Sequence, residues 1–135
     1  MNATITTGEL SQFNVLTKTW LSETEYISNE IRFLKDLVSH HTAFLSDESY
    51  LVSLQQQSKI LNNLEKDTEK VSENLQQQMH RLHEVYAGKP MSVSVKDNHG
   101  ILEKQIALLT KEFRSIRNNV LELVAELEEK KPDVE

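Results

Sequence analysis

The sequence predicts an all-α fold: an elongated, up-down-up antiparallel three-helix bundle with coiled-coil-like packing. Apolar residues recur in alternating steps of three and four over three long stretches, which is the spacing of one helix face and not of a strand. The three glycines and two prolines of the 135-residue chain stand at or near the ends of these stretches. Three amphipathic helices joined by short links cover their apolar faces most simply as one bundle, so residues 1–135 are expected to form a single domain.

The first expected helix covers about residues 7–45, after a frayed segment at residues 1–5. Thr6 is a suitable N-cap, and Glu9 three residues later completes a capping box. The apolar face that follows is broad enough to contact two neighbouring helices. It contains Phe13, Leu16, Trp20, Ile27, Ile31, Leu34, Leu37, Val38 and Leu45. Trp20, the lone tryptophan, is interpreted as a core anchor.

The second expected helix covers about residues 47–87. Ser46, followed by two acidic residues, predicts an N-cap and a first turn favoured by the helix dipole. One unbroken helix through this point is the alternative, because neither glycine nor proline marks the break. Gly88 and Pro90 indicate where the helix ends. The apolar stripe contains Leu54, Gln57, Leu61, Leu64, Thr68, Val71, Leu75, Gln78, Leu82 and Val85.

Three members of that stripe are polar: Gln57, Thr68 and Gln78. A polar layer inside a helical core can fix the register or the oligomeric state at some cost in stability. The same residues can instead lie at the boundary of the core, in contact with solvent. The sequence leaves both interpretations open.

The third expected helix covers about residues 98–131, with Asp97 or Asn98 as its N-cap and residues 132–135 frayed. The preceding Met-Ser-Val-Ser-Val segment is expected to be extended. The stripe of this helix has the four-three rhythm without a polar interruption. It contains Leu102, Ile106, Leu109, Phe113, Ile116, Val120, Leu123 and Leu127.

Composition narrows the classes of function. The formal net charge of −6 disfavours general nucleic-acid binding and adhesion to anionic membranes, which both need an excess of basic residues. The chain has no cysteine, which excludes disulfides, thiolate metal sites and cysteine catalysis. No signal peptide and no apolar run of about 20 residues is recognised, so a cytoplasmic protein is expected. No nucleotide-binding or catalytic motif indicates a small-molecule substrate.

Five residues near the second link are candidate metal ligands. His80 and Glu84 are spaced i, i+4, as are His99 and Glu103, and His83 lies nearby. Imidazole and carboxylate groups suit zinc or iron. In the heptad frame set by the apolar stripe, His80 and His83 point outward. Solvated surface histidines are therefore the favoured interpretation, and a metal-binding bundle is the alternative.

Part of the chain resembles known helical proteins in its heptad-like sequence pattern. The run WLSETEYISNEIRFLKDLV, followed by the Gln- and Asn-rich LQQQSKILNNLEKDTEKV, resembles small helical proteins of unknown function from Bacteroidota-type bacteria. The resemblance covers about the first two thirds of the chain. It implies a bacterial source and a cytoplasmic location, and it carries no activity, cofactor or catalytic residue.

The sequence favours a non-enzymatic interaction or scaffold module, with no cofactor and no catalytic residue. A thin bundle often leaves part of an apolar seam uncovered, which predicts a protein partner or self-association into a dimer. Leu108 and Val124, beside the third stripe, are the candidate contacts for self-association. A helical subunit that completes its core only with a partner is a further alternative.

Overall fold

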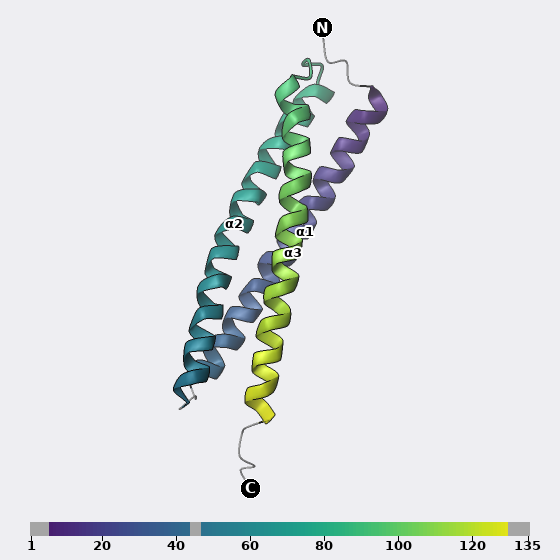
Figure 1. The fold of residues 1–135 in the computed structure, drawn as a ribbon. Helices are drawn as coiled ribbons and strands as arrows, with labels where there is room; N and C mark the ends of the chain where they lie inside the picture. Colours follow the sequence, from purple (N-terminus) through teal and green to yellow (C-terminus); the bar gives the residue numbers. More distant parts are fainter. Residues whose placement is uncertain (1–5, 44–46, 130–135) are drawn as a thin grey trace.

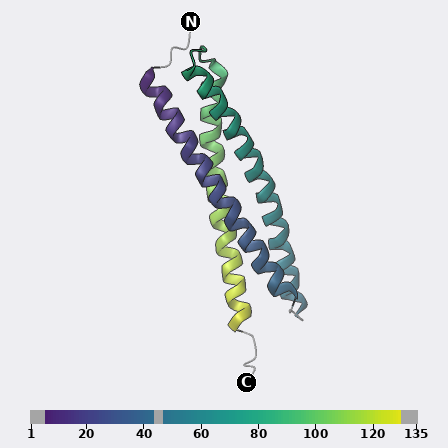
Figure 2. The same cartoon turned by 180° about the vertical axis from the view of Figure 1, so that it is seen from behind.

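The computed structural model describes residues 6–43 and 47–129, which form three long helices. Helix α1 spans Thr7–Ala43, α2 spans Glu48–Tyr86 and α3 spans Val93–Glu129. Helix α2 runs antiparallel to the other two, and α1 crosses α3 obliquely (Figure 1; Figure 2). The predicted all-α, antiparallel three-helix architecture is confirmed. Within residues 6–43 and 47–129, none of the helices contains an apolar stretch that could span a lipid bilayer.

The helix ends follow capping chemistry. The Thr6 hydroxyl accepts a hydrogen bond from the Glu9 backbone N–H at 3.0 Å, as the capping box requires. Asp47 caps α2, since its carboxylate accepts the Ser49 N–H at 3.0 Å. The predicted cap, Ser46, lies outside the described residues. At the other end of α2, Gly88 takes a φ of +103°, the left-handed conformation that glycine adopts without a steric penalty.

Helix α3 begins at Val93, five residues before the predicted start, so the expected extended conformation is wrong for residues 93–95. Asn98, expected as a cap, instead turns toward α2 and hydrogen-bonds Asn74 and Gln78. Val95 lies in the added turn and is buried in a small cluster with Leu10 and Leu82. Burial of Val95 and the inward bonds of Asn98 together stabilise a longer helix than the capping signals indicated.

The core is a continuous set of apolar side chains from all three helices. Every residue of the predicted α3 stripe is buried except Leu123, which packs partly buried against the core. Val124 is buried as well, at 7% exposed, which contradicts its prediction as a surface contact. Trp20 is buried at the interface of α1 with α3, as predicted.

Polar residues take part in this core. Thr68 and Gln78 are fully buried, which supports a polar core layer, whereas Gln57 is half-buried at the boundary. Thr17 and Thr68 each donate a hydrogen bond to a carbonyl four residues earlier in their own helix, at 2.7 Å. These bonds satisfy the buried hydroxyls, so threonine occupies core positions without an unpaired donor.

Candidate functional site

The structure does not bring the five candidate metal ligands together at one point, although His80 and Glu84 are in contact. His80 Nε2 lies 3.1 Å from Glu84 Oε1 on the outer side of α2, and the His83 side chain is exposed. Glu103 is exposed on α3, whereas His99 is buried at 7% exposed. In the part of the chain that the structure describes, no three His, Cys, Asp or Glu side chains are grouped so that they could hold a metal ion.

His99 lies in an aromatic contact between α3 and α1, and its expected surface position was wrong. Its ring stacks on Phe13 with centroids 3.9 Å apart and lies 4.9 Å from the Trp20 ring. The buried Nδ1 atom has no hydrogen-bond partner among residues 6–43 and 47–129. Extending the α3 stripe backwards from Leu102 by steps of three and four reaches His99 and Val95, a signal that would have placed both residues in the core.

Burial makes His99 sensitive to pH. Desolvation lowers the pKa of the imidazole from its usual 6.5, and the charge of Glu103 partly opposes the shift. Between the two pKa values, the unfolded chain binds more protons at this residue than the folded chain. The contribution of His99 to the stability of the fold is therefore fully present above its pKa in the unfolded state. This contribution is lost as the pH falls from that pKa to the lower pKa of the folded state.

We expect the free energy of unfolding, measured by urea denaturation at a series of pH values, to fall as the pH is lowered below about 6.5. Replacing the imidazole with an apolar side chain in His99→Leu removes this part of the pH dependence. The matched control is His83→Gln, because His83 is exposed. A pH dependence of His99→Leu equal to that of wild type would contradict the assignment.

Three amide side chains join α2 to α3 near the second link. Asn74 and Asn98 exchange two hydrogen bonds, at 3.1 and 3.2 Å. Asn98 Nδ2 also donates to Gln78 Oε1 at 2.9 Å, and Gln78 Nε2 donates to the Val95 carbonyl at 2.9 Å. We call Asn74, Gln78 and Asn98 the amide cluster. It holds the two helices together at one end of their interface.

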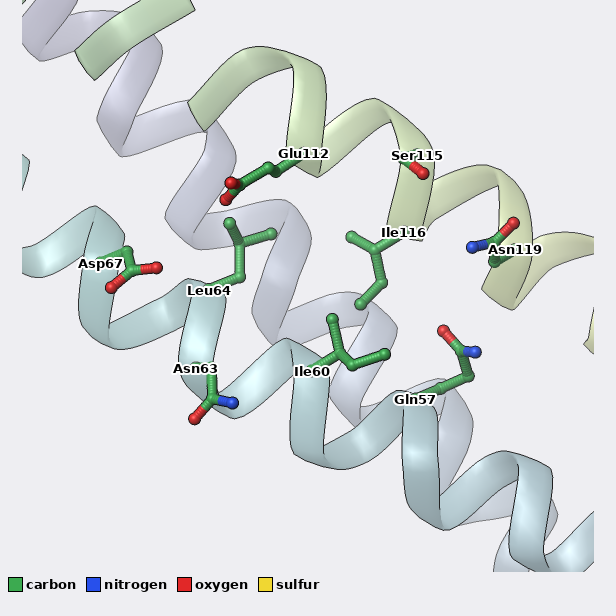
Figure 3. Close-up of a pocket in the computed structure, with 9 residues that line it drawn as sticks. All are labelled: Gln57, Ile60, Asn63, Leu64, Asp67, Glu112, Ser115, Ile116 and Asn119. Carbon is green, nitrogen blue, oxygen red and sulfur yellow. The ribbon is translucent and has the colours of Figure 1, made fainter. Parts of the chain in front are cut away.

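A groove opens between α2 and α3 beyond the amide cluster. Two hollows of about 290 and 210 Å³ share Asp67 and Glu112 in their linings, so they lie next to each other along α2 and α3. The larger hollow is shown in Figure 3, with the lining side chains of the two helices on opposite sides. Its lining residues are Gln57, Ile60, Asn63, Leu64, Asp67, Glu112, Ser115, Ile116 and Asn119. We call this feature, from residues 57–71 and 105–119, the α2–α3 groove.

The α2–α3 groove combines apolar surface with hydrogen-bond acceptors. Ile60 on α2 and Leu108 on α3 are 49% and 57% exposed, although both side chains are large and apolar. Leu64 and Ile116 are buried, and they point into the gap of the larger hollow beside Ile60 (Figure 3). Leu108 lines the smaller hollow with the buried Val71 and Leu109. Gln57 Oε1 is buried and has no hydrogen-bond partner in the described ranges. An apolar floor with polar groups at its edges is the arrangement that protein-binding grooves use.

The sequence identified only part of this groove. Leu108 is exposed, and its role as a contact residue stays a prediction. The other predicted contact, Val124, belongs to the core instead. Ile60 stands directly before Leu61 of the α2 stripe, and that adjacent position was the available signal for its place on the edge of the seam.

Comparison of this chain with protein-family models, with curated protein sequences and with solved structures finds no match to any of them.

Proposed function

We propose that this chain is a non-enzymatic helical interaction module that binds an α-helix of a protein partner in the α2–α3 groove. The observation that carries the proposal is that an exposed apolar side chain lines each of the two hollows, Ile60 in the larger and Leu108 in the smaller, beside buried apolar residues. Covering this surface removes apolar area from water, which is the main driving force of protein association. We also propose a cytoplasmic location for the protein.

The shape of the groove supports a helix as the bound element. Its walls are two long helices, α2 and α3, that lie side by side (Figure 1). A helix laid between them would contact both walls with residues spaced i, i+3, i+4 and i+7, as in other helix-in-groove complexes. With such a helix bound, the complex would have the arrangement of a four-helix bundle.

A selection experiment tests the proposal. Helical peptides of about four turns are selected from a display library for binding to the wild-type chain, and the dissociation constants of the best binders are measured by calorimetry. We expect the double variant Ile60→Glu, Leu108→Glu to weaken their binding at least ~30-fold, about 2 kcal/mol, because charges then replace the central apolar contacts.

Phe33→Glu is the matched control for this experiment. Phe33 is as exposed as Leu108, but it lies on α1 and away from the α2–α3 groove. The control variant should bind the selected peptides as wild type does, and circular dichroism should show that all variants keep their helices. Selected peptides that bind the double variant as tightly as wild type would refute a helix-binding role for the groove.

A further inference from the structure

We infer that the occupant of the α2–α3 groove is a basic amphipathic helix of about four turns from a partner protein. This inference rests on the proposed function and adds the chemistry of the partner. Three features carry it: the charges on the edges of the groove, an unpaired acceptor within it, and its length.

The charges of the groove are mostly negative. In the larger hollow, Asp67 from α2 and Glu112 from α3 are the charged lining residues, and both are acidic and exposed. The smaller hollow adds Lys70 to the same two carboxylates. Figure 3 shows Asp67 and Glu112 on opposite walls, at the same end of the larger hollow. A helix between these walls can place lysine or arginine on each of its flanks, opposite a carboxylate.

A side-chain acceptor of the groove also favours a partner rich in hydrogen-bond donors. Gln57 Oε1 is an acceptor that is removed from solvent without a hydrogen bond from the described residues. Such a group costs free energy unless a donor reaches it. Lysine and arginine side chains donate hydrogen bonds and accept none, so they match this acceptor as well as the two carboxylates.

The groove sets the length of the occupant. Its lining extends from Gln57 to Val71 on α2 and from Gln105 to Asn119 on α3. Each of these segments is about 21 Å long at 1.5 Å per residue, which corresponds to about four turns of a bound helix. Toward the second link, the walls are joined by the hydrogen bonds of the amide cluster, and the groove ends before them.

A second copy of the chain fits this surface less well than a basic helix. A two-fold symmetric contact uses the same patch on both copies. Each copy would bring the carboxylates of Asp67 and Glu112 and one lysine, Lys70, to the contact, so the paired surfaces would carry twice as many acidic as basic groups. Like charges across an interface disfavour association, and the formal net charge of −6 adds to that repulsion.

Two synthetic peptides of 15 residues test the inference. Both peptides carry leucine at positions 1, 4, 8, 11 and 15, and both have a side-chain link on the outer face that stabilises the helix. They differ only in the residues that flank the leucine face, which are lysines in one peptide and glutamates in the other. Fluorescence anisotropy should show the lysine peptide binding the wild-type chain at least ~10-fold tighter than the glutamate peptide, about 1.4 kcal/mol. The difference should shrink as salt is raised.

Neutralising the carboxylates should remove this preference. The variant Asp67→Asn, Glu112→Gln is expected to lose most of its discrimination between the two peptides. The control variant Glu69→Gln, Glu73→Gln removes the same charge from exposed positions that do not line the groove, and it should discriminate as wild type does. Equal loss of discrimination in both variants would overturn the assignment to Asp67 and Glu112.

The remaining outcomes separate the inference from the proposed function. Equal binding of both peptides that is lost in Leu108→Glu would overturn the basic partner and keep the helix-binding groove. No binding of either peptide would overturn both. Sedimentation showing a dimer of the chain that Leu108→Glu dissociates would identify a second copy as the occupant and overturn the partner proposed here.

Discussion

Phe113→Ala is expected to lower the free energy of unfolding by about 3–5 kcal/mol, which is the usual cost of removing a buried aromatic ring. Phe113 lies in the middle of α3 and is 4% exposed. Its ring is nearly perpendicular to the ring of Tyr26 on α1, with centroids 6.2 Å apart. The substitution removes apolar contacts and leaves a cavity that rigid neighbouring helices fill only in part.

The matched control for Phe113→Ala is Leu108→Ala, one and a half turns earlier on the same helix. Leu108 is large and apolar but exposed, so its truncation should change stability by less than about 0.5 kcal/mol. Both values come from urea denaturation monitored by circular dichroism. Similar losses of unfolding free energy for the two variants would show that the apolar stripe of α3 does not form the core of the bundle.

Gln78→Ala is expected to cost about 2–4 kcal/mol, because it leaves buried polar groups unpaired and opens a cavity. Gln78 is 0% exposed. Its amide bonds both Asn98 and the Val95 carbonyl, so truncation removes a donor and an acceptor at once. The free energy of unfolding from urea denaturation measures the loss.

Gln77→Ala supplies the control, because Gln77 is the adjacent residue and is exposed. It should change stability by less than about 0.5 kcal/mol. Gln78→Leu separates the two causes: leucine fills most of the space, so a loss smaller than that of Gln78→Ala is expected, and the remainder reports the missing hydrogen bonds. A Gln78→Ala variant as stable as wild type would rule out a structural role for the amide cluster.

The architecture was largely predictable from the sequence, because burial of a helix face imposes its own period. The steps from Leu102 to Val120 repeat four and three, and every one of these stripe residues is buried. The same period placed Thr68 and Gln78 in the stripe of α2 despite their polarity. Periodicity succeeds there because it depends on geometry along one helix and does not require knowledge of the neighbours.

The start of α3 and the place of His99 were not predicted, because both depend on contacts between helices. Asp97 and Asn98 have the chemistry of caps, but Asn98 is bound by Asn74 and Gln78 from α2. His99 was interpreted as polar surface, whereas Phe13 and Trp20 cover its ring. In both cases the polar residue type indicated a position at the helix end or on the surface, whereas packing between helices places the side chain against a neighbouring helix.

The groove was the least predictable feature. Leu108 and Val124 both flank the α3 stripe, and the sequence predicts the same surface contact role for both. The structure buries Val124 in the core and leaves Leu108 exposed beside α2. Which flank of a helix stays uncovered depends on the angles at which the other two helices cross it, and those angles are not encoded in the period of one stripe.

The order of the helices has a consequence for how the chain reaches this structure. Helices that follow one another in sequence are also packed together, with α2 against both of the others. Pairing α1 with α2, or α2 with α3, requires closure of only a short link, and closure of short links is rapid and costs little entropy. Assembly can therefore begin from either hairpin, and the chain belongs to the class of topologies that fold fastest.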